Sequence, residues 1–353
     1  MRLAFILDHP LMSYRVPFFN ILQSMSGHEI VIYHPGKLCP LKENNFEQVT
    51  TPNIKIFNAF FYRKNINLKF YDVVVCMQNL RMLNLWLLSF NMLRKYKLIQ
   101  WGIGTSSSKG LGTEKTVPRI MRNYLMKLSD AVVFYSPFSL QFVNKSNQKK
   151  CFVAQNTVFN DLSEDLSSHY KNSFLFIGSL NKRKGLREMI SIFHQYFKSN
   201  PSNIKTLFII GDGEEHNYIN DYIKINNLQD HIIMVGKIDS MKEKITYFKR
   251  SIASISLNQA GLSVLESFSF GVPFITKENA ISGGEHLNII DNENGLLIQQ
   301  TDDLLQKLLY IDKNIEFGVK LGHNAFNYYH ENASMDLMVN NFAKAINYAI
   351  NRK

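Results

Sequence analysis

The chain has 353 residues, of which 45% are hydrophobic and 20% are charged. This composition excludes an intrinsically disordered or fibrous protein, and the length is about twice that of a typical domain, so we expect two folded domains. The three cysteines, Cys39, Cys76 and Cys151, form no close pair and no metal-ligand spacing. We therefore expect a cytoplasmic protein with no disulfides and no bound metal.

Positive charge is concentrated in the first 150 residues, which hold 20 Lys and Arg against 7 Asp and Glu, a net charge of +13. The remaining residues hold 20 against 22, a net charge of −2. This asymmetry predicts an anionic partner for the N-terminal part of the chain. No recognisable nucleic-acid module accompanies the charge, so we expect no nucleic-acid partner.

Basic residues are mixed with large apolar ones in residues 80–97 and again in residues 118–127. This blend suits the anionic inner face of a plasma membrane, which predicts peripheral attachment there through the basic N-terminal domain. The apolar part of the first segment, residues 84–93, is too short to cross a bilayer, which needs about 20 apolar residues. The alternative is a helix buried against a sheet with a solvated basic end.

The first predicted strand, residues 2–7, ends in polar residues and is followed by the start of a helix. A second strand, residues 98–101, runs into a glycine loop. Ligands of open parallel sheets bind at the carboxyl ends of the strands. We therefore expect substrate contacts from Asp8, His9, Tyr14, Arg15, Gly102 and Gly104, with local capping or packing as the alternative for His9.

Residues 174–177 are an apolar run that predicts a buried strand, and the glycine turn after it leads through a basic loop into a helix. Such a loop can bind phosphate by charge-assisted hydrogen bonds. The candidates are Gly178, Ser179, Arg183 and Lys184. A solvated basic turn is the alternative for Lys182 and Arg183.

Two further strands follow the same pattern: residues 207–210 end in a turn with Asp212, and residues 232–235 end in Gly236 and Lys237. Strands alternate with helical patterns along the whole chain. This alternation predicts two doubly wound parallel sheets, and it argues against a barrel or a helical bundle.

The most informative segment begins with the predicted strand 252–257, followed by Asn258 and a short helix. Gly261 and Leu262 open this helix, so the unpaired N–H groups around Ala260, Gly261, Leu262 and Ser263 would face an anion. Glu266 lies about one turn further on, where its carboxylate can accept the hydroxyls of a ribose. Taken alone, the segment also fits an ordinary strand, loop and helix of any α/β protein.

In this order, the segments over about residues 152–298 resemble the donor site of retaining glycosyltransferases of the two-Rossmann GT-B type, glycosyltransferase family 4, also called glycosyl transferases group 1. The resemblance implies an acceptor-binding domain over residues 1–157 and a nucleotide-sugar-binding domain over residues 170–334, with a cleft between them. The last helix, residues 335–353, would pack back on the first domain, and the polar stretch 156–173 would link the two.

The resemblance also implies roles for single residues. Lys184 matches a lysine that binds the donor diphosphate, and Glu266 matches the second of two glutamates with seven residues between them. Asn258 stands where the family has the first glutamate, near the donor sugar, and Ser179 stands where it has an arginine. Lys184, Glu266 and Asn258 are therefore the predicted catalytic residues.

The implied activity is transfer of a sugar, with retention, from a UDP- or GDP-sugar to a saccharide acceptor. The implied acceptor is lipid-linked, in assembly of bacterial capsule, O-antigen or lipopolysaccharide. No metal is expected, because the basic loop and the helix N-terminus can neutralise the leaving diphosphate. Two alternatives are a sugar-nucleotide epimerase of the same fold and a non-catalytic partner or scaffold subunit, the latter motivated by Asn258 and Ser179.

Overall fold

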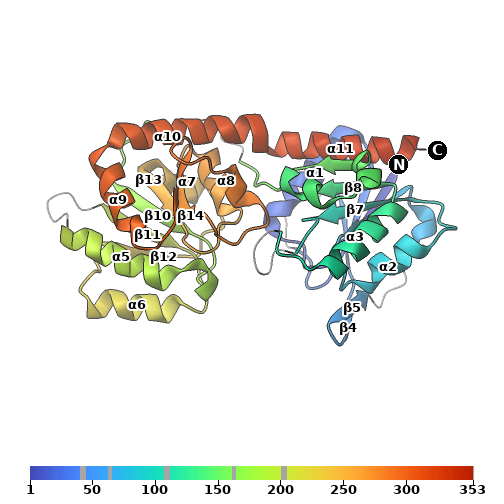
Figure 1. Cartoon of the computed structure of the whole chain (residues 1–353), viewed down its shortest axis with the longest axis horizontal. Helices are drawn as coiled ribbons and strands as arrows, with labels where there is room; N and C mark the ends of the chain where they lie inside the picture. Colours follow the sequence, from blue (N-terminus) through green and yellow to red (C-terminus); the bar gives the residue numbers. More distant parts are fainter. Residues whose placement is uncertain (40–44, 63–65, 107–111, 161–163, 200–204, 353) are drawn as a thin grey trace. The chain divides into compact units, whose positions relative to one another are not determined.

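The computed structural model of the chain describes residues 1–39, 45–62, 66–106, 112–160, 164–199 and 205–352. The chain divides into two compact units, Met1–Phe159 with Ser334–Lys353, and Asn160–Ala333. Figure 1 gives the labels of their helices and strands. Part of the predicted linker, residues 161–163, lies outside the described residues.

The N-terminal unit contains a parallel sheet with strand order β3-β2-β1-β6-β7-β8-β9. Its central strands are continuous apolar runs, as expected for strands covered on both faces. The bounds of the strands are β1 Arg2–Ile6, β2 Glu29–His34, β3 Glu47–Thr50, β6 Val73–Met77, β7 Lys97–Gly102, β8 Ala131–Phe134 and β9 Cys151–Val153.

Helices and one hairpin connect these strands. The antiparallel hairpin is formed by β4 Asn53–Ile56 and β5 Ala59–Tyr62. The α-helices are α1 Val16–Ser26, α2 Leu83–Phe90, α3 Thr116–Leu128 and α4 Lys145–Gln148, and the 3-10 helices are η1 Ser13–Arg15, η2 Leu68–Phe70 and η3 Pro137–Phe142. Helix α1 ends at Gly27, whose φ of 63° is the left-handed conformation that glycine adopts without strain.

The last helix, α11 Met335–Asn351, belongs to the N-terminal unit and packs on α1, β7, β8 and β9. The ring of Phe342 lies 5.1 Å from that of Trp101, 5.3 Å from that of Phe18 and 5.7 Å from that of Phe5. Aromatic pairs at such distances contribute about 0.5–1.5 kcal/mol each beyond their burial. The C-terminal segment therefore completes the core of the unit in which the chain begins.

The C-terminal unit contains a second all-parallel sheet with strand order β12-β11-β10-β13-β14-β15. From β10 the chain adds β11 and then β12 on one side. It then returns to place β13 on the other side of β10 and continues outward to β14 and β15. The two neighbouring central strands therefore form the switch point of a doubly wound sheet. The strands are β10 Ser173–Ile177, β11 Thr206–Ile210, β12 Ile232–Gly236, β13 Ser251–Ile255, β14 Phe274–Lys277 and β15 Gly295–Ile298.

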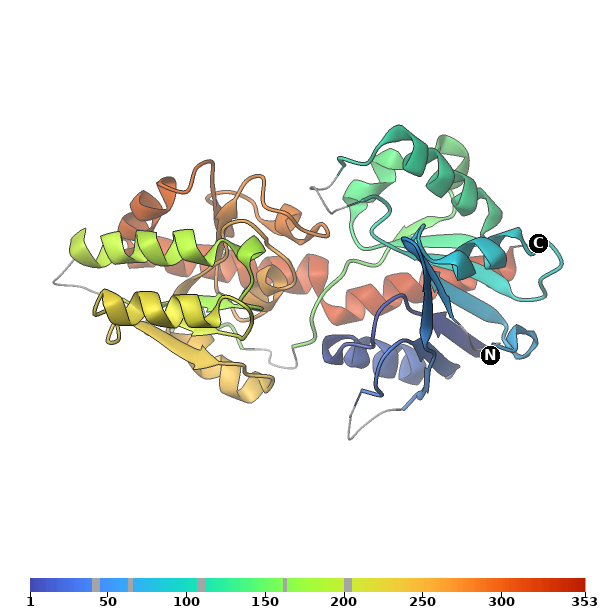
Figure 2. The ribbon, with the colours of Figure 1, turned by 90° about the horizontal axis from the view of Figure 1, so that it is seen from below.

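Amphipathic helices cover this sheet, and Figure 2 shows the yellow-green α5 running beside the yellow α6. The α-helices are α5 Leu186–Ser199, α6 His216–Ile225, α7 Met241–Arg250, α8 Ser263–Ser269, α9 Asp303–Lys313 and α10 Ile315–Tyr328. Two 3-10 helices, η4 Lys182–Lys184 and η5 Glu285–Asn288, and one π-helix, η6 Tyr329–Ala333, complete the unit.

The prediction of two doubly wound parallel sheets is confirmed. The predicted end of the strand before Asn258 and the predicted start of the helix after it differ from the structure. Strand β13 ends at Ile255, two residues early, because the Ser256 hydroxyl donates to the carbonyl of Gln259 at 2.8 Å and closes a turn. Helix α8 begins at Ser263, and Leu262 is its N-cap residue.

Candidate functional site at the carboxyl edge of the C-terminal sheet

Four loops meet at the carboxyl edge of the C-terminal sheet, and glycines let them approach closely. A Cβ at Gly211 would lie 1.8 Å from the carbonyl oxygen of Gly178, and one at Gly213 would lie 2.5 Å from that of Leu180. The N–H of Gly211 donates to Gly236 O at 2.9 Å, which ties in the loop after β12. Backbone, and not side chains, therefore forms this part of the edge.

Lys184 lies at the centre of these loops. Its ammonium donates to the carbonyl of Gln259 at 3.1 Å, and its own carbonyl accepts from the N–H of Asn258 at 3.4 Å. These two bonds join the basic loop after β10 to the loop after β13, the two strands at the switch point. An ammonium has three N–H donors, so two are left for a ligand once Gln259 is satisfied.

Burial of Lys184 lowers the pKa of its ammonium to about 8, although the nearby Glu285 carboxylate acts in the opposite direction. Lys182 and Arg183 precede it on the same 3-10 helix and are exposed. Ser179, which stands where the resembling family has an arginine, accepts a hydrogen bond from Asn181 Nδ2 at 2.8 Å. Three cations within three residues make this the basic side of the edge.

Asn258 lies against the basic loop. A Cβ at Gly185 would lie 2.7 Å from Asn258 Nδ2, and Gly185 has a φ of 71°, so both sterics and backbone conformation require glycine there. The carbonyl of Asn258 accepts from the N–H of Ile281 at 2.9 Å. The amide that replaces the expected glutamate is therefore held within the predicted site.

The N-terminus of α8 is open where a ligand would approach. A Cβ at Gly261 would meet no atom within 4 Å, whereas Ala260 is fully buried and donates its N–H to Ile281 O at 3.1 Å. The Ser263 hydroxyl oxygen is shielded from solvent and has no hydrogen-bond partner in the described part of the chain. Together with the N–H groups of Leu262 and Ser263, this hydroxyl can donate to an anion.

Glu266 forms an ion pair that the sequence interpretation missed. Its Oε1 lies 2.6 Å from Lys244 Nζ on α7, and both side chains are largely buried, with exposed fractions of 13% and 15%. The two residues lie 22 positions apart on different helices, so no local sequence pattern indicates this pair. Lys244 fixes one carboxylate oxygen and leaves Oε2 for a ligand hydroxyl.

The remaining predicted donor residues lie along the same edge with less direct contacts. Asp212 Oδ1 accepts from the N–H of Gly213 at 2.8 Å, so this carboxylate caps its own turn. Gly236 has a φ of 85° with open space beside it. Lys237 is exposed and pairs with Asp239 at 2.7 Å.

In the N-terminal unit, Asp8 follows β1 at the carboxyl edge of the sheet. Its Oδ2 accepts from Asn79 Nδ2 at 2.8 Å, and its Oδ1 lies 3.8 Å from His9 Nε2 without a hydrogen bond in the described part of the chain. His9 Nδ1 contacts the carbonyl of Pro10 at 2.9 Å. Asn79 was missed from the sequence, although it follows the apolar run of β6 as Asp8 follows β1.

Arg15 is buried in an aromatic cage. Its guanidinium carbon lies 4.7 Å from the ring centre of Trp101, 4.9 Å from that of Tyr135 and 5.4 Å from that of Tyr14. Such cation–π contacts stabilise a desolvated guanidinium. Arg15 therefore packs as a core residue, with Tyr14 partly exposed beside it.

Gly102 and Gly104 allow the loop after β7 to pass close to its neighbours. A Cβ at Gly104 would lie 2.7 Å from the ring of Phe134, and its φ is 82°. A Cβ at Gly102 would lie 3.0 Å from that of Gln78. Close packing at this edge therefore favours glycine at both positions.

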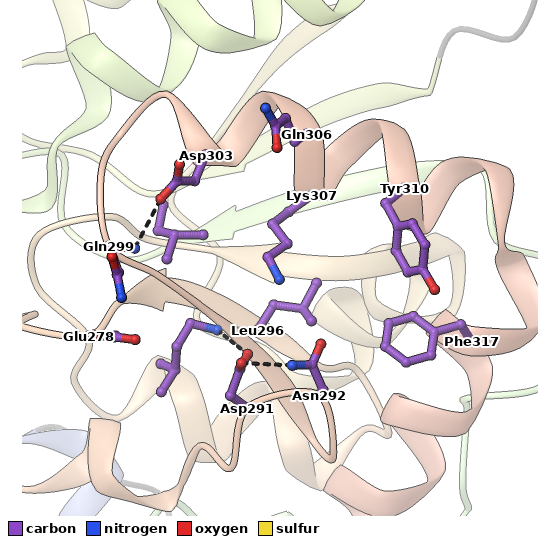
Figure 3. Close-up of a pocket in the computed structure, with 12 residues that line it drawn as sticks. Glu278, Asp291, Asn292, Leu296, Gln299, Asp303, Gln306, Lys307, Tyr310 and Phe317 are labelled. Carbon is purple, nitrogen blue, oxygen red and sulfur yellow. Dashed lines mark hydrogen bonds between the residues drawn. The ribbon is translucent and has the colours of Figure 1, made fainter.

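A hollow of about 610 Å³ lies elsewhere in the C-terminal unit, beside β15 and α9 (Figure 3). Asp303 Oδ2 accepts from the N–H of Gln299 at 3.2 Å, and Asp291 Oδ1 accepts from that of Leu297 at 2.8 Å. The hollow shares no lining residue with the loops after β10 and β13. Its carboxylates, which also include Glu278, disfavour a diphosphate, so we place the candidate site at the loops.

No group of three or more His, Cys, Asp and Glu residues that could hold a metal ion is found within the described ranges. None of the helices in these ranges has the length and apolar character needed to cross a membrane.

Comparison with known proteins agrees with this geometry. Residues 160–328 match the family model described as Glycosyl transferases group 1. A curated relative, the uncharacterized glycosyltransferase MJ1059 of Methanocaldococcus jannaschii, is 27% identical over 172 residues, which are 44% of this chain and 41% of the relative. The chain therefore matches less than half of that relative's length.

Solved structures match the whole fold. A glycosyltransferase from Rickettsia africae ESF-5 has a TM-score of 0.73 at 15% identity, covering 100% of this chain and 99% of its own. Anabaena Alr3699/HepE in complex with UDP has a TM-score of 0.71 at 12% identity, covering 98% and 100%. Residues 160–328 therefore resemble the Glycosyl transferases group 1 family, within a chain that has the GT-B fold.

Proposed function

We propose that the protein transfers a sugar, with retention, from a nucleoside-diphosphate sugar to a saccharide acceptor. The observation that carries the proposal is the junction of Lys184 with the loop that opens α8. It sets an ammonium beside open backbone N–H groups at the switch point of the sheet. Switch points are where doubly wound sheets bind nucleotides. The Anabaena structure with UDP supports a uridine nucleotide as the first donor to test.

In this proposal the diphosphate lies between Lys184 and the N–H groups of Gly261, Leu262 and Ser263. Negative charge develops on the diphosphate as the glycosidic C–O bond breaks, and these groups stabilise it. The exposed Arg183 adds a further cation at the same side. Leaving-group stabilisation would be the main contribution to catalysis.

Glu266 would hold the ribose. Its free Oε2 can accept one hydroxyl, and Oε1, held by Lys244, can accept a second alongside the ammonium. Gly236 and Lys237 would lie along the base, since their loop joins the same edge through Gly211. Asn258 would hydrogen-bond the donor sugar through its amide without contributing charge.

The acceptor hydroxyl would bind in the N-terminal unit, where Asp8 Oδ1 has no hydrogen bond in the described part of the chain. A carboxylate with one free oxygen suits a sugar hydroxyl. His9, Tyr14 and the loop with Gly102 and Gly104 would complete that site. We propose a lipid-linked saccharide acceptor in bacterial surface-polysaccharide assembly, by analogy with the family that the sequence resembles.

A test of donor binding does not require the acceptor to be known. Calorimetry and thermal unfolding of the full chain with UDP, GDP and their sugars should give saturable binding for one base. A ligand at one hundred times its Kd stabilises the fold by about 2.7 kcal/mol. Glu266→Gln should weaken the binding at least tenfold, whereas Lys171→Met, at a buried lysine that donates to Leu166 O, should not. Absence of binding to every nucleotide would overturn the proposal.

Asn258 supports one second candidate, a non-catalytic partner that keeps the nucleotide site. The family's glutamate at this position is charged, and the amide is not. Slow hydrolysis of a bound nucleotide sugar in the absence of acceptor would favour the enzyme. Tight binding with no turnover, even after Asn258→Glu, would favour the partner.

A further inference from the structure

Helices α2 and α3 of the N-terminal unit pack side by side (Figure 1). Large apolar side chains on and next to both helices are exposed. Leu93, just after α2, is 92% exposed and Met92 is 74% exposed. The apolar residues of this face, which we call the α2–α3 face, are Leu87, Phe90, Met92, Leu93, Val117, Ile120, Met121 and Tyr124. Exposed apolar clusters of this kind mark interaction surfaces.

The core does not need these residues. Helix α2 buries Leu85 and Leu88 in the unit, and α3 buries Leu125 and Met126. The outward side chains are also joined across the two helices, since the ring of Phe90 lies 6.1 Å from that of Tyr124. The exposed apolar residues of α2 and α3 therefore meet at Phe90 and Tyr124, in addition to the buried sides of the two helices.

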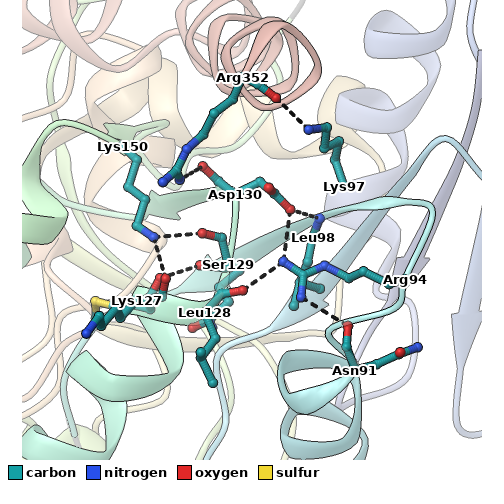
Figure 4. Close-up of polar contacts among 12 residues, drawn as sticks. Asn91, Arg94, Lys97, Leu98, Lys127, Leu128, Ser129, Asp130, Lys150 and Arg352 are labelled. Atoms are coloured by element: carbon teal, nitrogen blue, oxygen red, sulfur yellow. Dashed lines mark hydrogen bonds and ion pairs between the residues drawn. The ribbon is translucent and has the colours of Figure 1, made fainter.

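Several basic residues near the face are used inside the unit (Figure 4). Arg94 donates to the carbonyl of Leu128 at 2.8 Å and pairs with Asp130 at 3.2 Å. Lys97 donates to the carbonyl of Arg352 at 2.6 Å, and Lys150 donates to that of Ser129 at 2.7 Å. These cations hold the end of α3 and the end of α11, so they are not available to a partner.

Four other cations of the α2–α3 face remain exposed: Lys95, Lys115, Arg119 and Lys127. None of the four side chains forms an ion pair within the described ranges. The single acid between residues 83 and 129 is Glu114, which pairs with Arg122 at 2.7 Å and is 4% exposed. The apolar surface is therefore surrounded by uncompensated positive charge.

We propose that the α2–α3 face docks on a lipid bilayer that carries anionic head groups. Apolar side chains would enter the head-group boundary while the four cations meet lipid phosphates. A second copy of the chain fits less well, because a two-fold contact would bring the same four cations together. A nucleic acid would leave the apolar residues unused. This inference rests on the proposed function, which includes a lipid-linked acceptor. Docking adds to it the surface that would bring the protein to the membrane where that acceptor lies.

The test uses the full chain with vesicles of phosphatidylcholine, with and without 30% phosphatidylglycerol. Trp86 reports on the face, since its ring stacks on that of Phe90 at 6.2 Å, whereas the chain's other tryptophan, Trp101, is buried. We expect saturable binding at least tenfold tighter to the anionic vesicles, and quenching of Trp86 by brominated lipid. Equal binding to both vesicles would overturn the proposal.

A matched pair of double variants locates the contact. Leu93→Ser with Lys95→Gln should weaken vesicle binding at least tenfold, since the lost cation alone contributes about fivefold and the lost apolar side chain multiplies that loss. Ile225→Ser with Lys224→Gln makes the same changes at an exposed apolar residue and its basic neighbour in the C-terminal unit, and should bind as wild type. Thermal unfolding checks that both variants fold.

Docking and donor binding can fail separately. UDP binding is measured on the same samples, and the Leu93 and Lys95 double variant should retain it. Vesicle binding without any nucleotide binding would overturn the proposed function and support docking. Nucleotide binding with wild-type vesicle affinity in the double variant, or a change in that variant from dimer to monomer, would overturn docking.

Discussion

The two units share a doubly wound parallel sheet, but the carboxyl edges of their sheets are built differently. In the N-terminal unit the edge is filled by side chains, with Arg15 enclosed by Trp101 and Tyr135. In the C-terminal unit the edge is formed by backbone, with Gly211 against Gly178 and open space beside Gly261. Within the described residues, the same topology therefore leaves open backbone beside Gly261 at the C-terminal edge and packed side chains around Arg15 at the N-terminal one.

This difference teaches what each edge can recognise. Backbone N–H groups and a partly desolvated ammonium stabilise an anion strongly, because few competing waters surround them. The guanidinium of Arg15 is instead enclosed by aromatic rings, whose cation–π contacts stabilise its charge away from solvent. We therefore propose that the diphosphate binds at the C-terminal edge and that the N-terminal edge binds neutral hydroxyls.

The largest effect is expected from adding a side chain where two backbone loops of the C-terminal edge touch. Gly211→Ala would place a Cβ 1.8 Å from the Gly178 carbonyl oxygen at a φ of 147°, so the two loops would have to separate. We expect a loss of about 3 kcal/mol or more in the free energy of unfolding of this unit, together with loss of nucleotide binding. Denaturant unfolding measures the first and calorimetry the second.

Gly261→Ala is the matched control, because its Cβ would meet no atom within 4 Å and its φ is not positive. It should leave the unfolding free energy within about 0.5 kcal/mol of wild type. Equal losses in the two variants would mean that close loop approach is not what shapes this edge.

The next largest effect distinguishes the roles of Lys184 and Arg15, the buried cations at the two edges. Lys184→Met should lower UDP affinity by about tenfold to a hundredfold, because a charge-assisted hydrogen bond to the diphosphate contributes about 1.5–3 kcal/mol. Arg15→Met should leave UDP affinity unchanged and lower the unfolding free energy instead, since the guanidinium packs in the core of its unit. Titration calorimetry and thermal unfolding of both variants give the comparison. A threefold or smaller change in Lys184→Met would contradict the assignment.

The sequence alone predicted what local patterns determine. Apolar runs, glycine turns and helix starts have short-range causes, so the parallel sheets and the segment around Glu266 were recognisable. The pairing of Glu266 with Lys244 was not, because it depends on how α7 and α8 pack against each other. The aromatic cage of Arg15 was missed for the same reason, since Trp101 on β7 and Tyr135 just after β8 lie far along the chain from Arg15.

A smaller effect is expected from Lys244. In Lys244→Met the Glu266 carboxylate loses the ammonium that fixes Oε1, so the affinity for UDP should fall about tenfold through the ribose. The affinity for pyrophosphate, which has no ribose, should stay the same, and Lys244→Arg should restore much of the loss. Calorimetry with both ligands distinguishes a positioning residue from one that merely stabilises the fold. Equal weakening for both ligands would exclude the positioning role.

The smallest effect is the pH dependence of nucleotide binding. Burial lowers the pKa of Lys184 to about 8, so the free protein loses this charge as the pH rises through that value. A bound diphosphate favours the ammonium and raises its pKa, so binding takes up a proton near pH 8 and is weaker above it. Between pH 7 and pH 8.5 we expect UDP affinity to fall about fourfold if only the charged form binds.

Lys171 is the control for this pH dependence. Burial also lowers the pKa of Lys171 to about 8, but its ammonium donates to Leu166 O outside the candidate site. Lys171→Met should therefore keep the fall of UDP affinity with pH, whereas Lys184→Met should abolish it. Calorimetry in buffers of different ionisation enthalpy measures the proton uptake directly. A slope that survives in Lys184→Met would assign the titration to a group other than this lysine, and the contrast between the two edges would then rest on backbone alone.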